Sequence, residues 1–421
     1  MTSATGRTLL ANIVNDVMIE AAPPSYATAM AAVTPRKLWL AEPGDCVVTL
    51  APCPPAFRDY VARTLALDLG GVDIVAPDTI RGIHALDVVA ALGATARVTA
   101  RPTLVPFVVD TRVTAFARAT GMRLYPYDTV PDDGTVAAVR RINTKQGFRR
   151  IAAGLGLPVA DGGYADQPES LTAGLEQFLA GRRAAIVKVN RSSNGHGTFV
   201  VRDDAGSPPV AQQVRRAIAE QGAPRCGWVY EELLPFDSVP SIEMNVTATG
   251  VSEFYSCDQR SVDNAWTGMT TPAARGRLSG TLTEAAQRIG GWLLDHGYRG
   301  IFDLDCGVFE GRYVVTEANV RRTGGTYLEE LVGRLRRLAG VEHKPSYWHA
   351  DVRRGTTRLD FAAAVGALER AGLTDPAAGA RVLLPVDTLR TDGKWRYLVC
   401  GTDAGSVADA ERELTGLLEL V

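Results

Sequence analysis

Two neighbouring β-rich runs in the sequence hold the densest set of side chains that could do chemistry. Asp303 and Asp305 alternate along the first run, and Glu317, Asn319 and Arg321 alternate along the second. Side chains two residues apart on a strand share a face, so each set projects to one side. Carboxylate and amide oxygens suit Mg²⁺, and a guanidinium suits phosphate or an acyl phosphate. The alternative is a solvated edge strand whose charges form structural salt bridges.

Two lysines precede these runs. Lys145 follows a turn at Asn143 and Thr144, and Lys188 lies in the apolar run AAIVKVN. A lysine in such a run needs a partner for its ammonium group, unless it lies at a sheet edge and extends to solvent.

A polar loop, RSSNGHG, comes three residues after Lys188. Its glycines lack Cβ, and its serines supply hydroxyls, so the loop can bring N–H groups against phosphate oxygens. It is not a Walker A loop, because no GK[ST] follows and a strand comes next. His196 is interpreted as a loop side chain, with contact to phosphate as the alternative. The loop residues expected at the phosphates are Ser192, Ser193, Asn194, Gly195 and Gly197.

Three further segments are candidates for substrate binding. The run WVYEELL, with Glu231 and Leu234 at its end, can read adenine through its backbone edge, or it can be plain core. Gly324 and Gly325 begin a helix after Arg322, where free N–H groups suit a carboxylate or phosphate; a simple N-cap is the alternative. Residues 256–272, which include Arg260, are interpreted as a substrate loop or a surface excursion.

The bulk composition narrows the function classes. The formal net charge is −2, from 45 Lys and Arg against 47 Asp and Glu, so no basic excess points to nucleic acid. The 6 cysteines form no CxxC pair, and only 5 histidines occur, which disfavours a zinc site and fits a reducing cytoplasm. The first residues lack a signal-peptide pattern, and no apolar run reaches 18 residues. We therefore expect a soluble cytoplasmic protein without membrane association.

The pattern of elements predicts a mixed α/β (α+β) protein. Apolar runs at 46–52 and 72–78 flank a helix at 57–70 that ends at a glycine, which is βαβ logic and predicts a parallel sheet. No GxGxxG follows these strands, which disfavours a dinucleotide fold. We divide the chain into residues 1–135, residues 136–345 with a mobile lobe at about 155–235, and a small C-terminal α/β unit at 346–421.

The combination of these features resembles the ATP-grasp superfamily over roughly residues 136–338, and the region before it resembles a pre-ATP-grasp domain. The resemblance implies that the polar loop is the lid over the β- and γ-phosphates. The loop departs from the common K-P-x-x-G-x-G pattern, since Val189 follows the lysine.

The resemblance also assigns roles to individual residues. Lys145 and Lys188 would bind ATP phosphates, Glu231 and Leu234 would frame adenine, and Ser241 or Glu243 would reach the ribose. Asp305, Glu317 and Asn319 would hold one or two Mg²⁺ ions, with Asp303 as the alternative to Asp305, and Arg321 would steady the acyl phosphate with Lys188 as the other catalytic group.

The superfamily's chemistry implies an ADP-forming ligase that joins a carboxylate to an amine through an acyl phosphate. EANVRRTGGTYLEEL and the extra C-terminal unit look like the pheganomycin-type peptide ligases. That implies a small carboxylic acid or amino acid and an amine, amino acid or peptide as substrates, in natural-product biosynthesis. Arg260, Arg322, Gly324 and Gly325 are the candidate substrate residues. The alternatives are a nucleotide-binding protein without ligase activity and an ATP-grasp phosphotransferase or carboxylase. The oligomeric state stays open, with a homodimer through the N-terminal sheet as one candidate.

Overall fold

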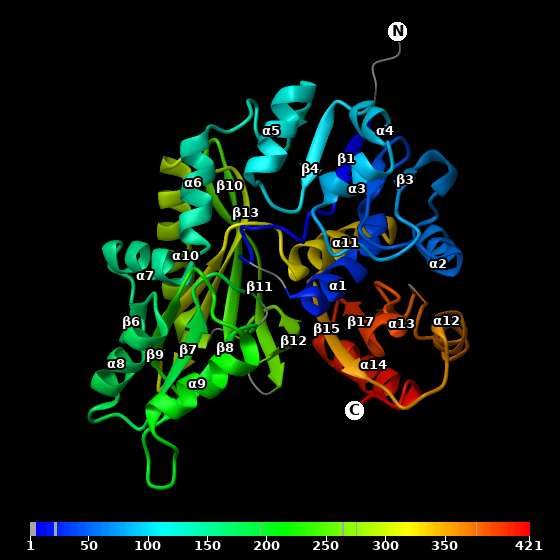
Figure 1. Ribbon diagram of the computed structural model, residues 1–421. Helices are drawn as coiled ribbons and strands as arrows, with labels where there is room; N and C mark the ends of the chain where they lie inside the picture. Colours follow the sequence, from blue (N-terminus) through cyan, green and yellow to red (C-terminus); the bar gives the residue numbers. More distant parts are fainter. Residues whose placement is uncertain (1–5, 21–22, 194, 263–264, 275, 376) are drawn as a thin grey trace.

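The computed structural model describes residues 6–20, 23–193, 195–262, 265–274, 276–375 and 377–421. Within these ranges the strands form three sheets, of five, eight and four strands. Figure 1 shows the eight-stranded sheet in the middle, the four-stranded sheet at its lower left, and the five-stranded sheet at the upper right. This arrangement is the mixed α/β fold that the sequence predicts.

The N-terminal sheet has the order β3-β2-β1-β4-β5, and every neighbouring pair runs parallel, which confirms the βαβ interpretation. The helix expected at 57–70 ends earlier, because Ala66 takes a left-handed conformation (φ 49°). The elements of the N-terminal domain are β1 (Arg7–Leu10), α1 (Pro24–Ala32), the 3-10 helix η1 (Thr34–Leu40), β2 (Cys46–Val48), α2 (Pro55–Leu65), η2 (Leu69–Gly71), β3 (Asp73–Val75), α3 (Ala85–Ala91), α4 (Thr95–Thr99), β4 (Thr103–Pro106), α5 (Thr111–Thr120) and β5 (Arg123–Leu124).

The next segment is a pair of helices rather than one continuous helix. Thr144 caps the second helix by accepting the N–H of Gly147 at 3.0 Å, which places Lys145 in its first turn. A small antiparallel sheet of order β6-β9-β7-β8 follows, with α8 and α9 on one side of it (Figure 1). The elements are α6 (Asp133–Ile142), α7 (Lys145–Gly154), β6 (Gly162–Ala165), α8 (Pro168–Leu179), β7 (Ala184–Val189), β8 (Thr198–Arg202), α9 (Val210–Gln221) and β9 (Trp228–Glu232).

The large sheet is antiparallel throughout, in the order β14-β13-β10-β11-β12-β15-β17-β16. The three C-terminal strands extend this sheet through the β12–β15 pairing and do not form a sheet of their own. Its elements are β10 (Pro240–Thr247), β11 (Gly250–Val262), β12 (Ala265–Thr271), η3 (Gly276–Leu278), α10 (Ser279–Asp295), β13 (Gly300–Phe309), β14 (Arg312–Asn319), α11 (Gly324–Leu338), β15 (Tyr347–Arg354), α12 (Phe361–Arg370), β16 (Ala380–Leu383), α13 (Leu389–Asp392), β17 (Lys394–Gly401) and α14 (Ala404–Leu417).

The interpretation of residues 256–272 as a loop is wrong. Most of this segment lies in β11 and β12, which pair with each other and with β10 and β15. The segment is polar because these strands carry hydrogen-bonded side chains between packed layers, and alternation along a strand allows one face to be polar while the other is apolar.

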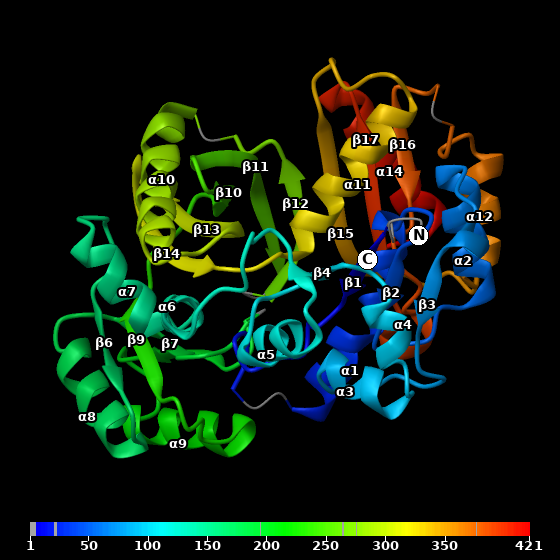
Figure 2. The ribbon, with the colours of Figure 1, turned by 90° about the horizontal axis from the view of Figure 1, so that it is seen from above.

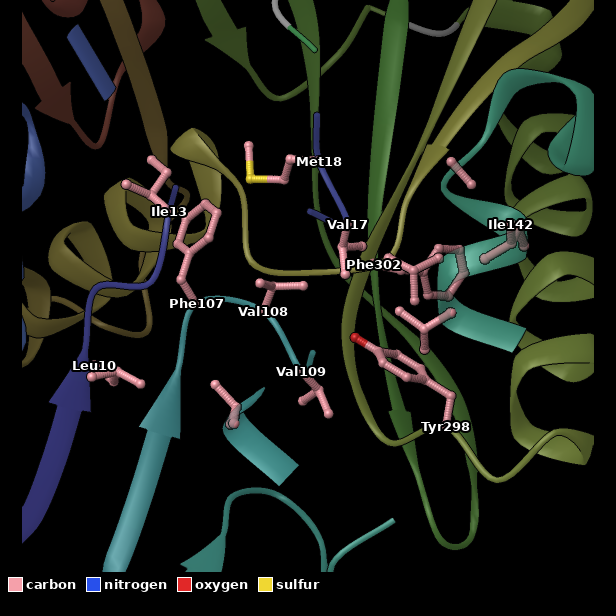
Figure 3. Close-up of a cluster of buried hydrophobic side chains, with 14 of the residues drawn as sticks. Leu10, Ile13, Val17, Met18, Phe107, Val108, Val109, Ile142, Tyr298 and Phe302 are labelled. Atoms are coloured by element: carbon pink, nitrogen blue, oxygen red, sulfur yellow. The ribbon is translucent and has the colours of Figure 1, made fainter. Parts of the chain in front are cut away.

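Alternation along β10 and β13 decides which residues face the site. Ile242, Met244, Phe302 and Leu304 are fully buried in the same core as Leu282 and Ile289 of α10. The residues between them therefore project to the opposite face. This core continues toward the N-terminal sheet: Figure 3 shows Phe107, Val108 and Val109, which follow β4, across from Tyr298 and Phe302. Figure 2 shows the same junction from above, with β4 beside the large sheet.

Among the described residues, no helix has the length and hydropathy needed to cross a bilayer.

The core on β13 gives a stability prediction. Leu304 is 0% exposed, and Leu338 at the end of α11 is 58% exposed. Leu304→Ala should lower the free energy of unfolding by about 2–5 kcal/mol, because it leaves a cavity in a packed core. The matched variant Leu338→Ala should change it by less than about 0.5 kcal/mol. Urea unfolding followed by fluorescence measures both, and equal losses would contradict this placement of the core.

Candidate active site

The acidic runs form one hairpin, and their chemistry-bearing side chains share a face. Asp305 pairs directly with Glu317, and Asp303 with Asn319, across β13 and β14. Directly opposed residues of an antiparallel pair point to the same side of the sheet. The amide nitrogen of Asn319 donates to Asp303 at 3.1 Å and to Asp305 at 3.2 Å. Both aspartates therefore face the site, and the structure does not separate Asp305 from Asp303.

Asp303 is buried, Asp305 is half-buried, and both lie close to other acids. Burial raises the pKa of Asp303 to about 7, and the negative charge of Glu243 adds to this effect. Burial also raises the pKa of Asp305 well above its usual value, and Asp303 and Glu317 raise it further. Gln259 of β11 donates to Asp305 at 2.5 Å, and Ser241 also bonds to it. Acids that oppose one another in this way are stabilised when a cation enters among them.

The first lysine closes the other side of this acidic face. The Nζ of Lys145 lies 3.2 Å from the Oε1 of Glu317 and donates to the carbonyl of Ser192 at 3.1 Å. Its backbone N–H donates to Asn190 at 2.8 Å. Lys145 thus links the start of α7, the polar loop and the acidic hairpin.

The second lysine is held by a buried carboxylate. The Nζ of Lys188 lies 2.6 Å from the Oε2 of Glu231, and Arg149 of α7 pairs with Oε1. Burial by itself would raise the pKa of Glu231, but Lys188 and Arg149 outweigh it and hold that pKa below its usual range. The side chain of Lys188 therefore points from β7 toward Glu231. Glu231 holds two cations, and Leu234 lies half-buried just beyond the end of β9.

The polar loop is tied down by residues on both sides of it. Ser192 and Ser193 are buried, and the hydroxyl of Tyr26 from α1 bonds to the hydroxyl of Ser193. The rings of Tyr26 and His196 lie 5.7 Å apart. Gly195 and Gly197 have positive φ angles of 71° and 72°.

A Cβ on Gly197 would lie 2.5 Å from the side chain of Val189, so glycine is required there. The predicted phosphate residue Asn194 lies outside the described residues.

Glu243 and Ser241 already have partners within the protein. The hydroxyl of Thr323 donates to Glu243 at 2.8 Å, the hydroxyl of Thr326 also bonds to it, and burial raises the pKa of Glu243 to about 7. Thr323 in turn accepts the N–H groups of Gly325 and Thr326, as an N-cap of α11. The carboxylate thus anchors the helix that begins at Gly324 and Gly325.

Arg321 and Arg322 lie at the end of the acidic hairpin. Arg321 donates to Asn143 at 3.1 Å, and the backbone N–H of Val320 donates to the same oxygen. Arg322 pairs with Glu330 of α11. Its backbone N–H donates to Phe107 at 3.1 Å, which joins the hairpin to the N-terminal domain.

Arg260 does not join the other candidate residues. Gln259 points to Asp305, so its neighbour Arg260 points to the opposite side of the sheet, where it pairs with Glu411 of α14 and lies 3.7 Å from Asp351. Glu411 also accepts from Tyr397 at 2.8 Å and lies 2.7 Å from the Nδ1 of His349. The predicted substrate role of Arg260 therefore has no support from its position.

Three contributors to the site escaped the sequence reasoning. Tyr26 sits in a helix of the N-terminal domain, and nothing local to the sequence marks it. Asn143 and Gln259 act through contacts across the fold, although alternation along β11 places Gln259 on the same face as Tyr255 and Cys257.

The donor set fits Mg²⁺ as a partly protein-bound ion. Within the described ranges, no three His, Cys, Asp or Glu side chains converge as a ready-made metal cage, and Glu317 pairs with Lys145. Mg²⁺ does not need such a cage, since it usually takes one or two carboxylates, phosphate oxygens and water. Asp303 and Asp305 on one buried face, with Asn319 and Glu317 beside them, supply that number of oxygens.

Comparisons with known proteins bear on the fold. Residues 34–122 match the family model described as Pre ATP-grasp domain. A search of the curated proteins gives no significant match. The structure is similar to an N5-carboxyaminoimidazole ribonucleotide synthetase in its ADP complex (TM-score 0.62, 14% identity, covering 100% of this chain and 98% of that chain).

Two further solved structures resemble the whole chain. One is the N5-carboxyaminoimidazole ribonucleotide synthetase of Thermus thermophilus (TM-score 0.60, 16% identity, 99% of each chain). The other is the biotin carboxylase of Campylobacter jejuni in a nucleotide complex (TM-score 0.61, 12% identity, 99% of this chain and 91% of that chain). The chain therefore has a fold similar to that of these solved structures over nearly its whole length, and residues 34–122 match the pre-ATP-grasp family model.

The Glu411 cluster gives a prediction for pH. Burial works against the charged form of Glu411, but bonds from His349, Arg260 and Tyr397 bring its pKa well below the usual range. A depressed pKa stabilises the fold above the unfolded-state pKa, and this contribution is lost as the pH falls through the folded-state pKa. Glu411→Gln should therefore lower the Tm at pH 7, and the gap to the wild type should narrow below about pH 4.5.

Thermal scans between pH 3 and pH 8 measure this gap. Glu176→Gln, on the exposed side of α8, serves as the control and should leave the Tm unchanged at every pH. A gap for Glu411→Gln that stays constant into acid would contradict the assigned role of the carboxylate.

Proposed function

We propose that this protein is an ATP- and magnesium-dependent ligase that joins a carboxylic acid to an amine, releasing ADP and phosphate. One observation carries the proposal. The buried acidic face of β13 and β14 lies against Lys145, and Lys145 and Ser192 tie it to the polar loop. An ammonium group that bridges an acidic face and a glycine-containing loop suits a nucleotide triphosphate with its metal ion.

The residues take the following roles. Lys145 and Lys188 bind phosphate oxygens of ATP, which replace the present carboxylate partners at their ammonium groups. Ser192, Ser193 and the glycines of the loop cover the phosphates, and Tyr26 holds that loop toward the N-terminal domain. Asp305, Glu317 and Asn319, with Asp303, hold Mg²⁺, which neutralises charge on the transferred phosphoryl group.

The proposed reaction has two steps. An oxygen of the substrate carboxylate attacks the γ-phosphorus, the bond to the ADP oxygen breaks, and an acyl phosphate forms. The amine then attacks the acyl carbon, phosphate leaves, and the amine loses a proton. Arg321 stabilises the acyl phosphate with charge-assisted hydrogen bonds. Positioning and charge neutralisation, with water excluded by the loop, supply the catalysis.

We further propose that the acid is a small carboxylic acid or amino acid and that the acceptor is an amine, amino acid or peptide. The motif EANVRRTGGTYLEEL at the end of β14 supports this narrower assignment, because it resembles the pheganomycin-type peptide ligases of natural-product pathways.

A second candidate is an ATP-dependent carboxylase, in which bicarbonate takes the place of the carboxylic acid. The full-length likeness to a biotin carboxylase and to N5-carboxyaminoimidazole ribonucleotide synthetases favours it. ADP formation that requires bicarbonate, and no other acid, would select this candidate.

Nucleotide product analysis tests the proposal. The protein is incubated with ATP, Mg²⁺ and a panel of carboxylic acids and amines. ADP and phosphate should appear in equal amounts and only when an acid and an amine are both present. Formation of AMP and pyrophosphate would exclude the proposed chemistry, and absence of any turnover across a broad panel would favour a nucleotide-binding protein without ligase activity.

Two substitutions test the assigned residues. Lys188→Met and Glu317→Gln should each lower kcat by at least about 100-fold, because each removes a group that neutralises or positions the transferred charge. The Tm should fall little, since Arg149 still pairs with Glu231 in the first variant and an acid–acid repulsion is relieved in the second. Lys344→Met and Glu176→Gln, both exposed, are the controls and should keep full activity. Full activity in Lys188→Met or Glu317→Gln would overturn the site.

A further inference from the structure

A cavity of about 120 Å³ continues the acidic face beyond the metal-binding groups. Along β10 and β13, Glu243 pairs with Asp303, and the next pair on the same face is Asn245 with Ile301. Asn245, Ile301 and Arg321 all line the cavity. The cavity therefore begins two residues along the strand from the proposed magnesium ligands.

The cavity has a basic end with an unsatisfied donor. Arg321 is 9% exposed, and its buried Nε has no hydrogen-bond partner among the described residues. Arg322 also lines the cavity and is paired with Glu330. A buried guanidinium donor without a partner costs free energy, and an anionic ligand would remove that cost.

A buried lysine lies behind the same wall. Lys37 of η1 is 5% exposed, and within the described part of the chain its ammonium makes no hydrogen bond or ion pair; it lies 5.6 Å from the centre of the Phe107 ring. Burial lowers the pKa of Lys37 to about 7, and the nearby charge of Arg322 lowers it further. Phe107, Arg322 and Glu330 surround Lys37 and also line the cavity. Three arginines (Arg299, Arg321 and Arg322) and one carboxylate (Glu330) thus line the cavity, with Lys37 behind its wall.

The remaining walls are mostly apolar. Val108, Val109, Phe254 and Tyr298 line the cavity, and Figure 3 shows Val108 and Val109 facing Tyr298 across the domain junction. A wider groove of about 480 Å³ shares Tyr125, Pro126, Asn245 and Arg299 with the cavity and opens it toward the surface. The cavity thus combines apolar walls with the guanidinium of Arg321.

We propose that this cavity binds the carboxylic acid that the ligase activates, and that the acid has a compact apolar body. Its carboxylate bonds to Arg321, beside the groups that hold magnesium and the γ-phosphate, and its body lies against Phe254, Val109 and Tyr298. This inference rests on the proposed ligase function. The groove lined by residues 125–132 admits larger substituents from the solvent side.

Ligand titration by NMR in the presence of MgADP tests the cavity without requiring turnover. The probes are phenylacetate, its neutral analogue phenylacetamide, and acetate. Phenylacetate should bind at least about tenfold more tightly than phenylacetamide, because only the carboxylate satisfies Arg321. Equal affinity of the acid and the amide would overturn the proposal.

Three variants locate the bound acid. Asn245→Phe adds a ring at the cavity and should weaken phenylacetate about tenfold or more while changing acetate by less than about twofold. Ile301→Phe is a second variant at the facing position, in case the first does not fold. Thr247→Phe adds the same ring two residues outward, at a position that lines only the groove, and should leave both affinities unchanged. Unchanged phenylacetate binding in folded Asn245→Phe and Ile301→Phe would place the acid elsewhere.

Lys37→Met tests whether the charge of Lys37 contributes to binding of the acid in the cavity. Removal of a buried unpaired charge should keep the Tm or raise it, and should weaken phenylacetate and acetate alike by about fivefold. Unchanged affinity for both acids would exclude a contribution from Lys37.

The outcomes separate the two proposals. If phenylacetate binds selectively and Asn245→Phe weakens this binding, but no substrate pair yields ADP, the proposed acid site is supported and the proposed ligase activity is excluded. If ADP forms only with an acid and an amine, but no cavity variant changes the affinity for phenylacetate, the proposed ligase activity is supported and the proposed acid site is excluded.

Discussion

The structure depends on the placement of three carboxylates, one buried and two half-buried, on one face of a hairpin. Burial raises the pKa of Asp303 and Asp305 there, and the charges of neighbouring acids raise both further. Asn319, Gln259 and Lys145 reduce the repulsion among these acids without removing it. A cation among these carboxylates would remove repulsion as well as make new contacts, which is the physical basis of the proposed Mg²⁺ site.

Other elements surround this face or hold the groups near it. Helix α7 begins at Lys145, which pairs with Glu317, and on the neighbouring small sheet β9 holds Lys188 of β7 through Glu231. The N-terminal domain contributes Tyr26 at the loop and Phe107 at the backbone of Arg322. The N-terminal domain therefore forms one wall of the candidate site, at both the polar loop and the proposed acid cavity.

Much of the catalytic face was accessible from local pattern. The two-residue alternation in IFDLD and TEANVR predicts a shared face for their acids, because strand geometry repeats every two residues. The parallel N-terminal sheet also follows from short apolar runs separated by helical segments. Residues 256–272 were misread, since polar side chains in strands between two packed layers look like a loop when only composition is considered. The end of helix α2 was also placed too late. The helix ends where Ala66 adopts a left-handed backbone conformation, before the first glycine that follows it in the sequence.

The sequence by itself determined which groups are present and which of them share a strand face, since covalent geometry fixes both. Only the tertiary structure decided which groups meet. It placed Arg260 behind the sheet with Glu411, used Glu243 to anchor α11, and brought Tyr26 to Ser193 across 167 residues of chain. Among the described residues, it also left the buried Nε of Arg321 without a hydrogen-bond partner. Such contacts depend on how sheets and helices pack at long sequence separation, and packing is a property of the whole chain that no local pattern records.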